Sequence, residues 1–331
     1  MKTVNREFEA RHNEALRILS LLSKEAERLD EDLVFLGGSA VQAILRNLKR
    51  LSIDLDVYYS GDAGKLITVL ESGGYQNTPR KSLSPGIFEF HTARKEGVMV
   101  KMDFLKIRVP EKYTFEKEIA EPEKGKFVAR VAKPEYLIAA KLSALAVGTV
   151  GRKTESETLE TDVVKDVYDF NSLCDEFPGL SAKTGEALLE IVAQQNKLRK
   201  TAYTMEEVFD SLEKTLKAIA HFGKKAIVTQ GAIKNFVEYL YGETELTRSE
   251  LAIMSMRALY HASAIQRGED LSKGEEAAKK EADRAYVSQC EKALATAGED
   301  PEMLHELKIF TPKALIYLYR SKFPIDISKD T

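Results

Sequence analysis

The chain has 331 residues, of which 44% are hydrophobic and 31% are charged, and its formal net charge is −3. A chain of this length can bury a large core and commonly forms two domains. The small net charge excludes nucleic-acid binding driven by overall charge, so any such binding needs a local patch. Two cysteines, Cys174 and Cys290, exclude a disulfide framework and suit a reducing compartment. Because no apolar run approaches the length of a membrane span and the charged N-terminus lacks a signal-peptide core, we expect a cytoplasmic protein.

The first predicted elements are a helix over residues 5–30 and a strand over Leu33–Leu36. Apolar side chains recur on one side of the helix, which is typical of an amphipathic helix that packs on a sheet. The apolar run of the strand stops at Gly37 and Gly38. Glycines allow a tight backbone turn and a close approach to a ligand, so this turn is a candidate binding site.

A second helix is predicted from Ser39 to Leu48, because Val41, Ile44, Leu45 and Leu48 recur at helical spacing. The first turn of a helix has unpaired N–H groups and the positive end of the helix dipole, which suits a phosphate. Gly37, Gly38 and Ser39 are therefore candidate phosphate ligands. The alternative for a Gly-Gly-Ser sequence alone is an ordinary capped helix.

The next strand is predicted over residues 52–59, where Asp54 and Asp56 alternate with apolar residues. Side chains two apart share one face of a strand and lie roughly 6–7 Å apart. Like charges so placed repel one another, and a divalent cation would relieve the repulsion. Oxygen ligands favour Mg²⁺ or Mn²⁺ over zinc. An exposed acidic strand is the alternative for an Asp-X-Asp sequence taken alone.

The two motifs together resemble nucleotidyltransferases of the polymerase-beta type. Within that superfamily, Gly37-Gly38-Ser39-Ala40 and Arg50-Leu51-Ser52-Ile53-Asp54-Leu55-Asp56 are similar to the AbiEii/AbiGii toxin family. That family has Gly-Gly-Thr/Ser-Ala, followed by Arg-X-Ser/Thr-X-Asp-hydrophobic-Asp. The resemblance implies an NTP substrate and a Mg²⁺ or Mn²⁺ cofactor, and it adds Arg50 and Ser52 to the candidate nucleotide-binding residues. For Arg50, a phosphate contact and a plain loop cation are equally open.

A strand over residues 98–106 holds the candidate third acid. Asp103 lies between Met102 and Phe104, where a carboxylate needs a partner. It could pair with Lys101 in a purely structural role. The resemblance implies a third metal-binding carboxylate without fixing its position, and Asp103 is the one Asp in the predicted strands after Asp56.

Lys133-Pro134 opens a predicted helix that runs to about Val147, with proline at a tolerated first-turn position. Lys141 lies in its apolar stripe, and a lysine there could extend to water. The alternative is a cation that offsets charge on a triphosphate. The family has a Lys-Leu dipeptide on such a helix, which Lys141-Leu142 matches.

After a polar stretch at 148–161, which we interpret as a surface loop, a helix is predicted over residues 162–174. Asp166 falls within its apolar arc, so it needs a partner, and Lys141 is the candidate. Lys165-Asp166-Val167-Tyr168-Asp169-Phe170 resembles the Arg-Asp-X-Tyr-Asp-Leu sequence of the family. Lysine in place of arginine puts a guanidinium role in doubt. Asp169 is interpreted as a solvated helix residue.

The rest of the chain is predicted to be helical, over 181–198, 204–221, 230–243, 247–267, 275–297 and 301–323. A basic group there is interrupted by acids, which indicates a solvated surface more than an RNA-binding patch; it consists of Lys197, Arg199, Lys200, Lys224 and Lys225.

The predicted fold class is α+β, with a small mixed nucleotidyltransferase sheet flanked by helices and followed by an all-α C-terminal region. We expect a catalytic domain over residues 1–130 and a helical domain over 131–331. In the latter, 131–175 would complete the nucleotide site and 176–331 would form a bundle.

The predicted function is metal-dependent transfer of NMP from an NTP to an acceptor hydroxyl. Asp54, Asp56 and Asp103 would bind the metal, Lys141 would contact phosphates, and Asp166 would orient Lys141 or take part in catalysis. The resemblance implies a toxin of a toxin–antitoxin or abortive-infection system, with RNA, tRNA or protein as acceptor and a neighbouring antitoxin as partner. The alternatives are a small-molecule nucleotidyltransferase of the antibiotic-modifying kind and a catalytically silent scaffold.

Overall fold

The computed structural model describes residues 6–46, 50–80, 88–121, 125–223, 225–241, 245–269 and 284–324. The chain divides into two compact units. The sheet unit comprises residues 1–137, 193–202 and 238–244, and the helical unit comprises 138–192, 203–237 and 245–331. Helices α4 (Pro134–Leu145) and α6 (Ser181–Arg199) contribute residues to both units.

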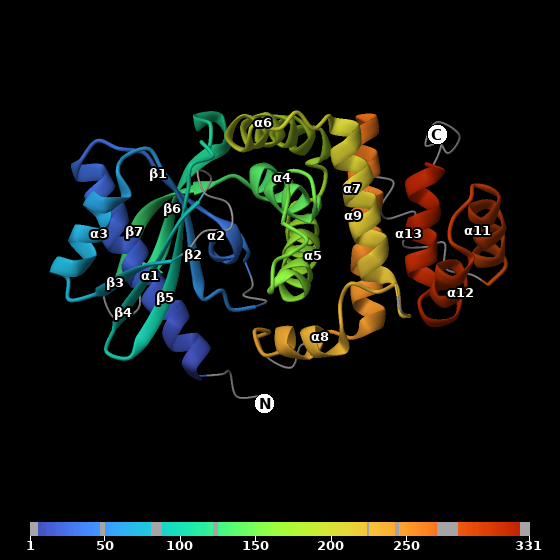
Figure 1. The fold of residues 1–331 in the computed structure, drawn as a ribbon, viewed down its shortest axis with the longest axis horizontal. Coiled ribbons are helices and arrows are strands. Elements are labelled where there is room, and N and C mark those ends of the chain that lie inside the picture. Colours follow the sequence, from blue (N-terminus) through green and yellow to red (C-terminus); the bar gives the residue numbers. More distant parts are fainter. Residues whose placement is uncertain are drawn as a thin grey trace. The chain divides into compact units, whose positions relative to one another are not determined.

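The sheet unit is built on a seven-stranded mixed sheet (Figure 1) with the order β3-β4-β5-β2-β1-β7-β6. Strand β2 pairs antiparallel with β1 and parallel with β5, and β1 pairs parallel with β7. The strands are β1 (Leu33–Leu36), β2 (Asp54–Tyr59), β3 (Gln76–Arg80), β4 (Phe88–Lys95), β5 (Val98–Leu105), β6 (Thr114–Glu121) and β7 (Gly125–Ala132).

Three helices flank this sheet: α1 (Arg6–Arg28), α2 (Gly37–Ile44) and α3 (Ala63–Ser72). Helix α1 packs against α3 and against strands β5, β6 and β7, as its single apolar side predicts. Helix α2 packs on β1 and β2, which brings its N-terminus to the strand that holds the paired acids. A 3₁₀ turn, η1 (Glu111–Tyr113), precedes β6.

The helical unit contains α5 (Leu159–Glu176), α7 (Met205–Ala220), α8 (Gln230–Val237), α9 (Arg248–Arg267), α11 (Arg284–Thr296), α12 (Pro301–Phe310) and α13 (Pro312–Lys322). Helix α9 is central, because α5, α7 and α13 all pack against it. Capping boxes begin α7 at Thr204 and α9 at Thr247, which fixes both helix starts locally. Among the described helices, none is long and apolar enough to cross a membrane.

The sequence predictions were confirmed for most helices and for the strands that carry the acids, and they were wrong in four respects. The helix expected over 230–243 ends at Val237. Helix α2 begins at Gly37 and ends at Ile44, whereas it was expected to run from Ser39 to Leu48, a residue outside the described ones. The single helix expected over 301–323 is two helices, because Pro312 has no N–H to continue the ladder. Strands β3, β6 and β7 were not predicted.

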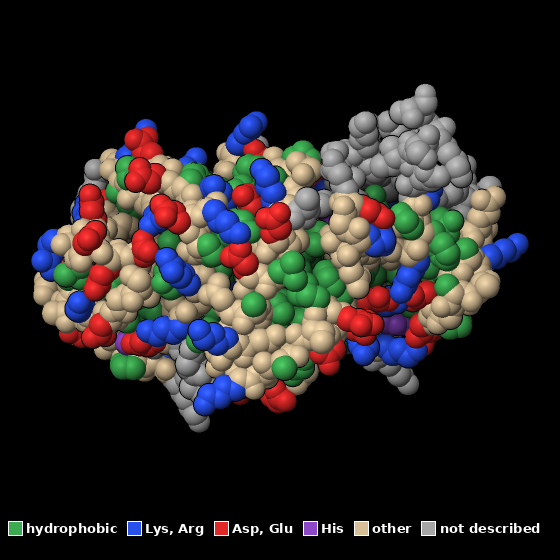
Figure 2. All heavy atoms as spheres, turned by 90° about the horizontal axis from the view of Figure 1, so that it is seen from above, with side chains coloured by type: hydrophobic (Ala, Val, Ile, Leu, Met, Phe, Trp, Pro, Cys, Tyr) green, Lys and Arg blue, Asp and Glu red, His purple; other side chains and the backbone are tan. Residues whose placement is uncertain are grey.

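Acidic and basic side chains are interspersed on the face shown in Figure 2. In the basic group considered above, Lys225 pairs with Asp300 and lies 3.6 Å from a carboxylate oxygen of Glu302. Lys224 lies outside the described residues. The paired Lys225 is what a solvated, charge-balanced surface predicts.

Candidate active site

The acids of the sheet unit lie on two neighbouring parallel strands. Asp54 and Asp56 occupy the half-buried positions of β2, while Leu55 and Val57 between and after them are buried. The parallel register places Asp56 directly opposite Asp103 of β5. Residues directly opposite one another have side chains on the same face of a sheet, so two strands bring three carboxylates to one face.

The electrostatics of this acidic face are unfavourable for three ionised carboxylates. Burial, and next the charge of Asp56, raise the pKa of Asp103 from 3.8 to about 7, with a smaller contribution from Asp54. Arg80 acts in the opposite direction but does not cancel these effects. In addition, Oδ1 of Asp54 is buried and has no hydrogen-bond partner among the described residues. A buried oxygen without a partner is costly, and a cation would satisfy it.

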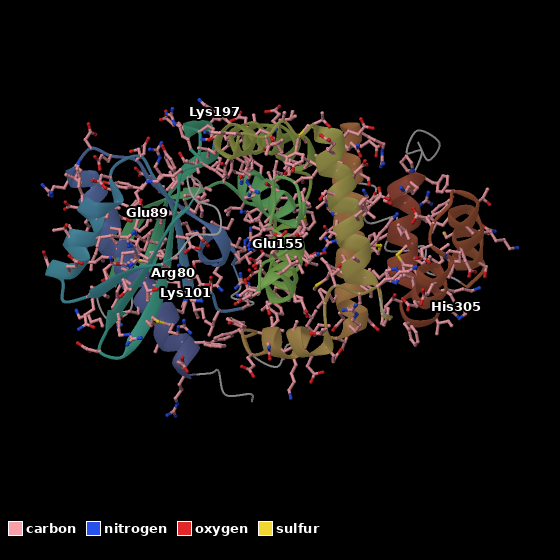
Figure 3. The ribbon with its side chains drawn as sticks, viewed as in Figure 1. Arg80, Glu89, Lys101, Glu155, Lys197 and His305 are labelled. Atoms are coloured by element: carbon pink, nitrogen blue, oxygen red, sulfur yellow. The ribbon has the colours of Figure 1, made fainter. Side chains whose placement is uncertain are left out.

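The cation paired with Asp103 is Arg80 of β3. Its Nη2 lies 2.5 Å from Oδ1 of Asp103, whereas Lys101, the partner considered from the sequence, lies opposite Asp54 in the register. Figure 3 labels Arg80 and Lys101 close together on the ribbon of the sheet. Sequence reasoning missed Arg80 because it is separated from Asp103 by 23 residues and belongs to a strand that was not predicted.

The Gly37-Gly38-Ser39 turn approaches this acidic face closely. Gly37 has φ +63°, and a Cβ atom there would lie 1.8 Å from Oδ2 of Asp56. The hydroxyl of Ser39 donates to the backbone carbonyl of Asp54. The N-cap residue of helix α2 is Leu36, whose apolar side chain accepts no hydrogen bond from the amides at the helix start. The turn therefore positions the N-terminus of helix α2 beside the carboxylates, and no side chain of its N-cap residue covers it.

Arg50 and Ser52 are both buried beside the glycine turn. Arg50 is 5% exposed, and a Cβ atom at Gly38 would lie 2.3 Å from its Nη2. Its Nη1 donates to the carbonyl of Leu51 over 3.1 Å, and Gln42 donates to the carbonyl of Arg50. Arg50 is therefore a buried cation and not a solvated one. Its charge is fixed next to the Gly37-Gly38-Ser39 turn.

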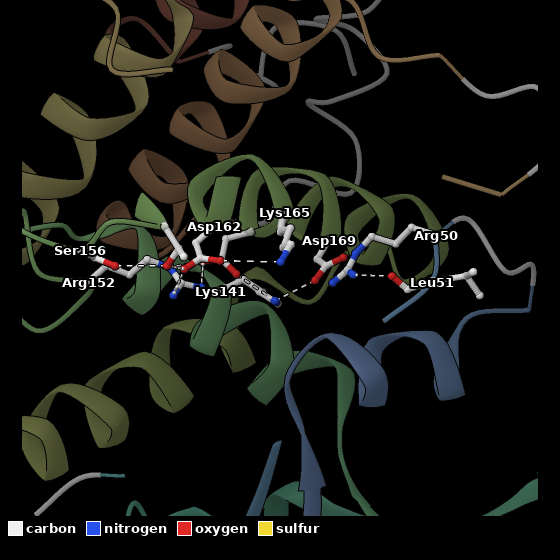
Figure 4. Close-up of polar contacts among 10 residues, drawn as sticks. Arg50, Leu51, Lys141, Arg152, Ser156, Asp162, Lys165 and Asp169 are labelled. Carbon is white, nitrogen blue, oxygen red and sulfur yellow. Dashed lines mark hydrogen bonds and ion pairs between the residues drawn. The ribbon is translucent and has the colours of Figure 1, made fainter. Parts of the chain in front are cut away.

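The helical unit holds a second charged cluster, shown in Figure 4, in which Lys141 contacts two aspartates. Its Nζ lies 2.9 Å from Oδ1 of Asp166 and 2.7 Å from Oδ2 of Asp169. The predicted pairing of Lys141 with Asp166 is confirmed. The interpretation of Lys141 as a lysine extending to water is wrong, because it is 8% exposed.

Arg152 completes this cluster from the loop between α4 and α5. Its Nε and Nη2 lie 2.8 and 2.6 Å from Oδ2 of Asp166, and its Nη1 lies 3.2 Å from Asp162. Burial would raise the pKa of Asp166, but the charges of Arg152 and Lys141 outweigh it and hold the pKa below its usual value. Asp166 thus stays ionised, and both of its oxygens are engaged by cations.

Two members of this cluster were missed by sequence reasoning. Asp169 is 2% exposed, so the interpretation as a solvated residue is wrong. Its spacing of three from Asp166 on a helix was the available signal, since such residues share a face. Arg152 stands in a polar loop, where no periodic pattern indicates burial.

The acidic face suits a divalent cation in its chemistry, although the carboxylates are not arranged as a finished ligand set. Within the ranges described above, no group of three or more His, Cys, Asp or Glu side chains is arranged to hold a metal ion. Carboxylate oxygens are the donors that Mg²⁺ and Mn²⁺ prefer. Added positive charge would give the unsatisfied oxygen of Asp54 a partner, and it would lower the raised pKa of Asp103. In its donor chemistry, this set of residues therefore fits a divalent cation.

Comparisons with solved structures give weak similarities. A nucleotidyltransferase-like antigenic protein from Paracoccidioides brasiliensis is 14% identical, with 60% of this chain and 92% of that chain covered and a TM-score of 0.35. The antibiotic-resistance factor ANT(2'')-Ia is 16% identical, with 55% and 91% covered and a TM-score of 0.32. These similarities support no statement about activity.

None of the curated proteins compared with the sequence matches it. A comparison with protein families, in contrast, gives an assignment. Residues 20–238, more than half of the chain, match the family described as nucleotidyl transferase AbiEii toxin, type IV TA system. The matched range includes the glycine turn, the three carboxylates of the sheet unit and the Lys141–Asp166 pair. This chain therefore belongs to the AbiEii family of nucleotidyltransferases.

Proposed function

We propose that this nucleotidyltransferase uses Mg²⁺ or Mn²⁺ to transfer NMP from an NTP to an acceptor hydroxyl. Asp54, Asp56 and Asp103 are the proposed metal-binding residues. The observation that supports this most directly is the register of Asp56 opposite Asp103, beside the buried and unsatisfied oxygen of Asp54. When bound, a divalent ion would offset negative charge on the phosphates and on the attacking oxygen.

The remaining residues of the sheet unit are proposed to bind and orient the reactants. The N-terminal amides of α2, at Gly37, Gly38 and Ser39, bind the β- and γ-phosphates, and Arg50 and Ser52 support that turn. Asp103 accepts the proton of the acceptor hydroxyl, whose oxygen then bonds to the α-phosphorus as pyrophosphate leaves. Carboxylates are among the side chains that act as general bases.

In the helical unit, Lys141 is the proposed phosphate-neutralising cation and Asp166 positions it. Because both oxygens of Asp166 are engaged by Lys141 and Arg152, we assign Asp166 a positioning role in preference to proton transfer. Asp166 holds Lys141 and Arg152 in place, so their positive charges come from fixed side chains.

The family description names a type IV toxin–antitoxin system. On that basis we propose that the protein acts as a toxin in the cytoplasm, with RNA or tRNA as the acceptor and an antitoxin encoded nearby. The two cysteines of the chain, Cys174 and Cys290, are both buried, and a chain with two cysteines has no disulfide framework, which is compatible with a reducing compartment.

The test is incubation of the purified protein with labelled NTPs, total RNA and Mg²⁺, followed by identification of the joined nucleotide and acceptor. Asp54→Ala is expected to lower label transfer by on the order of 100-fold or more, since even indirect supports of a metal site are worth 10–100-fold. Asp62→Ala, which removes a helix cap in the same unit, is the control and should retain transfer. Unchanged transfer in Asp54→Ala would refute the assignment, and label on a small molecule instead of RNA would replace the proposed acceptor.

A further inference from the structure

Arg80 is held over the acidic face by the backbone of two strands. Its Nε donates to the carbonyl of His91 on β4 over 3.1 Å, and its Nη2 donates to the carbonyl of Met102 on β5 over 3.4 Å. The same Nη2 lies 2.5 Å from Oδ1 of Asp103. Since the two carbonyls belong to the sheet, strand pairing helps to fix the position of the guanidinium beside Asp103.

This ion pair lies where an arriving cation can reach it. The side chains of Arg80 and Asp103 are 29% and 24% exposed, so the pair borders solvent. A guanidinium and a divalent ion that share one carboxylate repel each other over a few ångströms.

We propose that Arg80 is the resident counter-ion of Asp103 and that it sets the affinity of the acidic face for divalent cations. Without a metal, the guanidinium stabilises the Asp103 carboxylate next to Asp56. When the ion binds, Arg80 must either share Asp103 with the ion or release it. The free energy needed to displace Arg80 therefore lowers the affinity for the metal. This inference depends on the proposed metal site, and Arg80 acts in it as a positioning residue.

The test measures Mn²⁺ binding to the full chain without nucleotide, with free Mn²⁺ counted by electron paramagnetic resonance. Arg80→Gln is expected to bind Mn²⁺ about 10-fold more tightly, which corresponds to ~1.4 kcal/mol, because no guanidinium then has to be displaced from Asp103. Arg80→Lys keeps the charge and should remain close to the wild type. The control is Arg94→Gln, because Arg94 is an exposed residue of β4 that contacts Met99.

A double-mutant cycle separates competition at Asp103 from a general change of charge. In an Asp103→Asn background, Arg80→Gln should leave the remaining Mn²⁺ affinity unchanged, because the shared carboxylate is gone. An equal gain in both backgrounds would overturn the assignment. Circular dichroism of each variant verifies that the sheet is intact, and Arg80→Lys keeps the test valid if Arg80→Gln does not fold.

The outcomes for the inference and for the proposed function differ. If the wild type binds Mn²⁺ and Arg80→Gln binds it equally or more weakly, Arg80 is not a competing counter-ion and the metal site stands. If neither the wild type nor Asp54→Ala binds Mn²⁺, the metal site itself is refuted, and this inference with it.

Discussion

The two charged clusters contain similar residues but differ in charge balance. In the sheet unit, three aspartates crowd on β2 and β5, the pKa of Asp103 is raised, and one buried oxygen of Asp54 is unsatisfied within the described part of the chain. In the helical unit, the buried carboxylate of Asp166 contacts Lys141 and Arg152, and its pKa is lowered.

This difference separates a cluster with surplus negative charge from one whose buried carboxylate is already paired with cations. A carboxylate cluster with surplus negative charge gains free energy when it binds a cation, so its imbalance favours binding. A buried carboxylate that is paired with cations loses much when one partner is removed. We therefore expect substitutions in the two units to change different properties.

The largest expected effect is on the stability of the helical unit. Lys141→Met leaves Asp166 and Asp169 buried with less positive charge, which should lower the free energy of unfolding by about 3–5 kcal/mol. Urea denaturation followed by circular dichroism measures it. Lys165→Met is the matched control, because Lys165 lies 3.8 Å from Asp162 at a less buried pair, where about 1 kcal/mol or less is expected. If Lys141→Met loses label transfer but keeps full stability, Lys141 acts in the reaction and does not stabilise the helical unit.

The next effect is on catalysis in the sheet unit. Gly37→Ala forces a Cβ atom into the carboxylate of Asp56 and should lower nucleotide transfer about 100-fold, as expected for misplacement of a reacting group by about 1 Å. Steady-state label transfer measures it.

The matched control for Gly37→Ala is Gly97→Ala. Gly97 also has a positive φ, +84°, but a Cβ atom added there would meet no atom of the described residues within 4 Å. It should therefore lose only about 1–2 kcal/mol of stability from backbone strain, with transfer retained. Equal loss of transfer in both variants would show that strain, and not Asp56, explains the effect.

A smaller effect concerns pH and Asp103. In the metal-free folded protein the pKa of Asp103 is raised from 3.8 to about 7. At a pH between these two values, Asp103 is therefore protonated in the folded protein and ionised in the unfolded chain. The contribution of Asp103 to stability therefore falls as pH rises from 4 to 7, by about 1–2 kcal/mol after allowance for its partial exposure. Hydrogen exchange of β2 and β5 amides should show this slope, and Asp103→Asn should flatten it. A slope of opposite sign would contradict the raised pKa.

The pH dependence of stability that is due to Asp166 is the smallest effect near neutral pH. Its sign is opposite to that of Asp103, because here stability rises with pH. Its folded pKa lies below the usual 3.8, so its stabilising contribution is complete above that value and is lost as pH falls further. Acid unfolding of the helical unit should steepen below about pH 4 in the wild type and less so in Asp166→Asn. Equal acid slopes in the two proteins would show that Asp166 is not held ionised by its partners.

Much of the local structure followed from periodicity. The alternation around Asp54 and Asp56, the apolar strand before Gly37 and the helices that carry Lys141 and Asp166 were predictable, because each repeats within a few residues. Strand β3 was not, since Gln76–Arg80 lacks apolar alternation and is stabilised by pairing with β4.

The sequence by itself determined which residue types lie on which face of which element, because side-chain direction follows from the local repeat of helices and strands. Apart from the Lys141–Asp166 pair, only the tertiary structure decided the partners of the charges. Strand order brings Asp56 opposite Asp103 and carries Arg80 to it, and a loop residue, Arg152, reaches Asp166 across 14 positions of the chain. These pairings depend on how distant segments close on one another, and no local pattern encodes that closure.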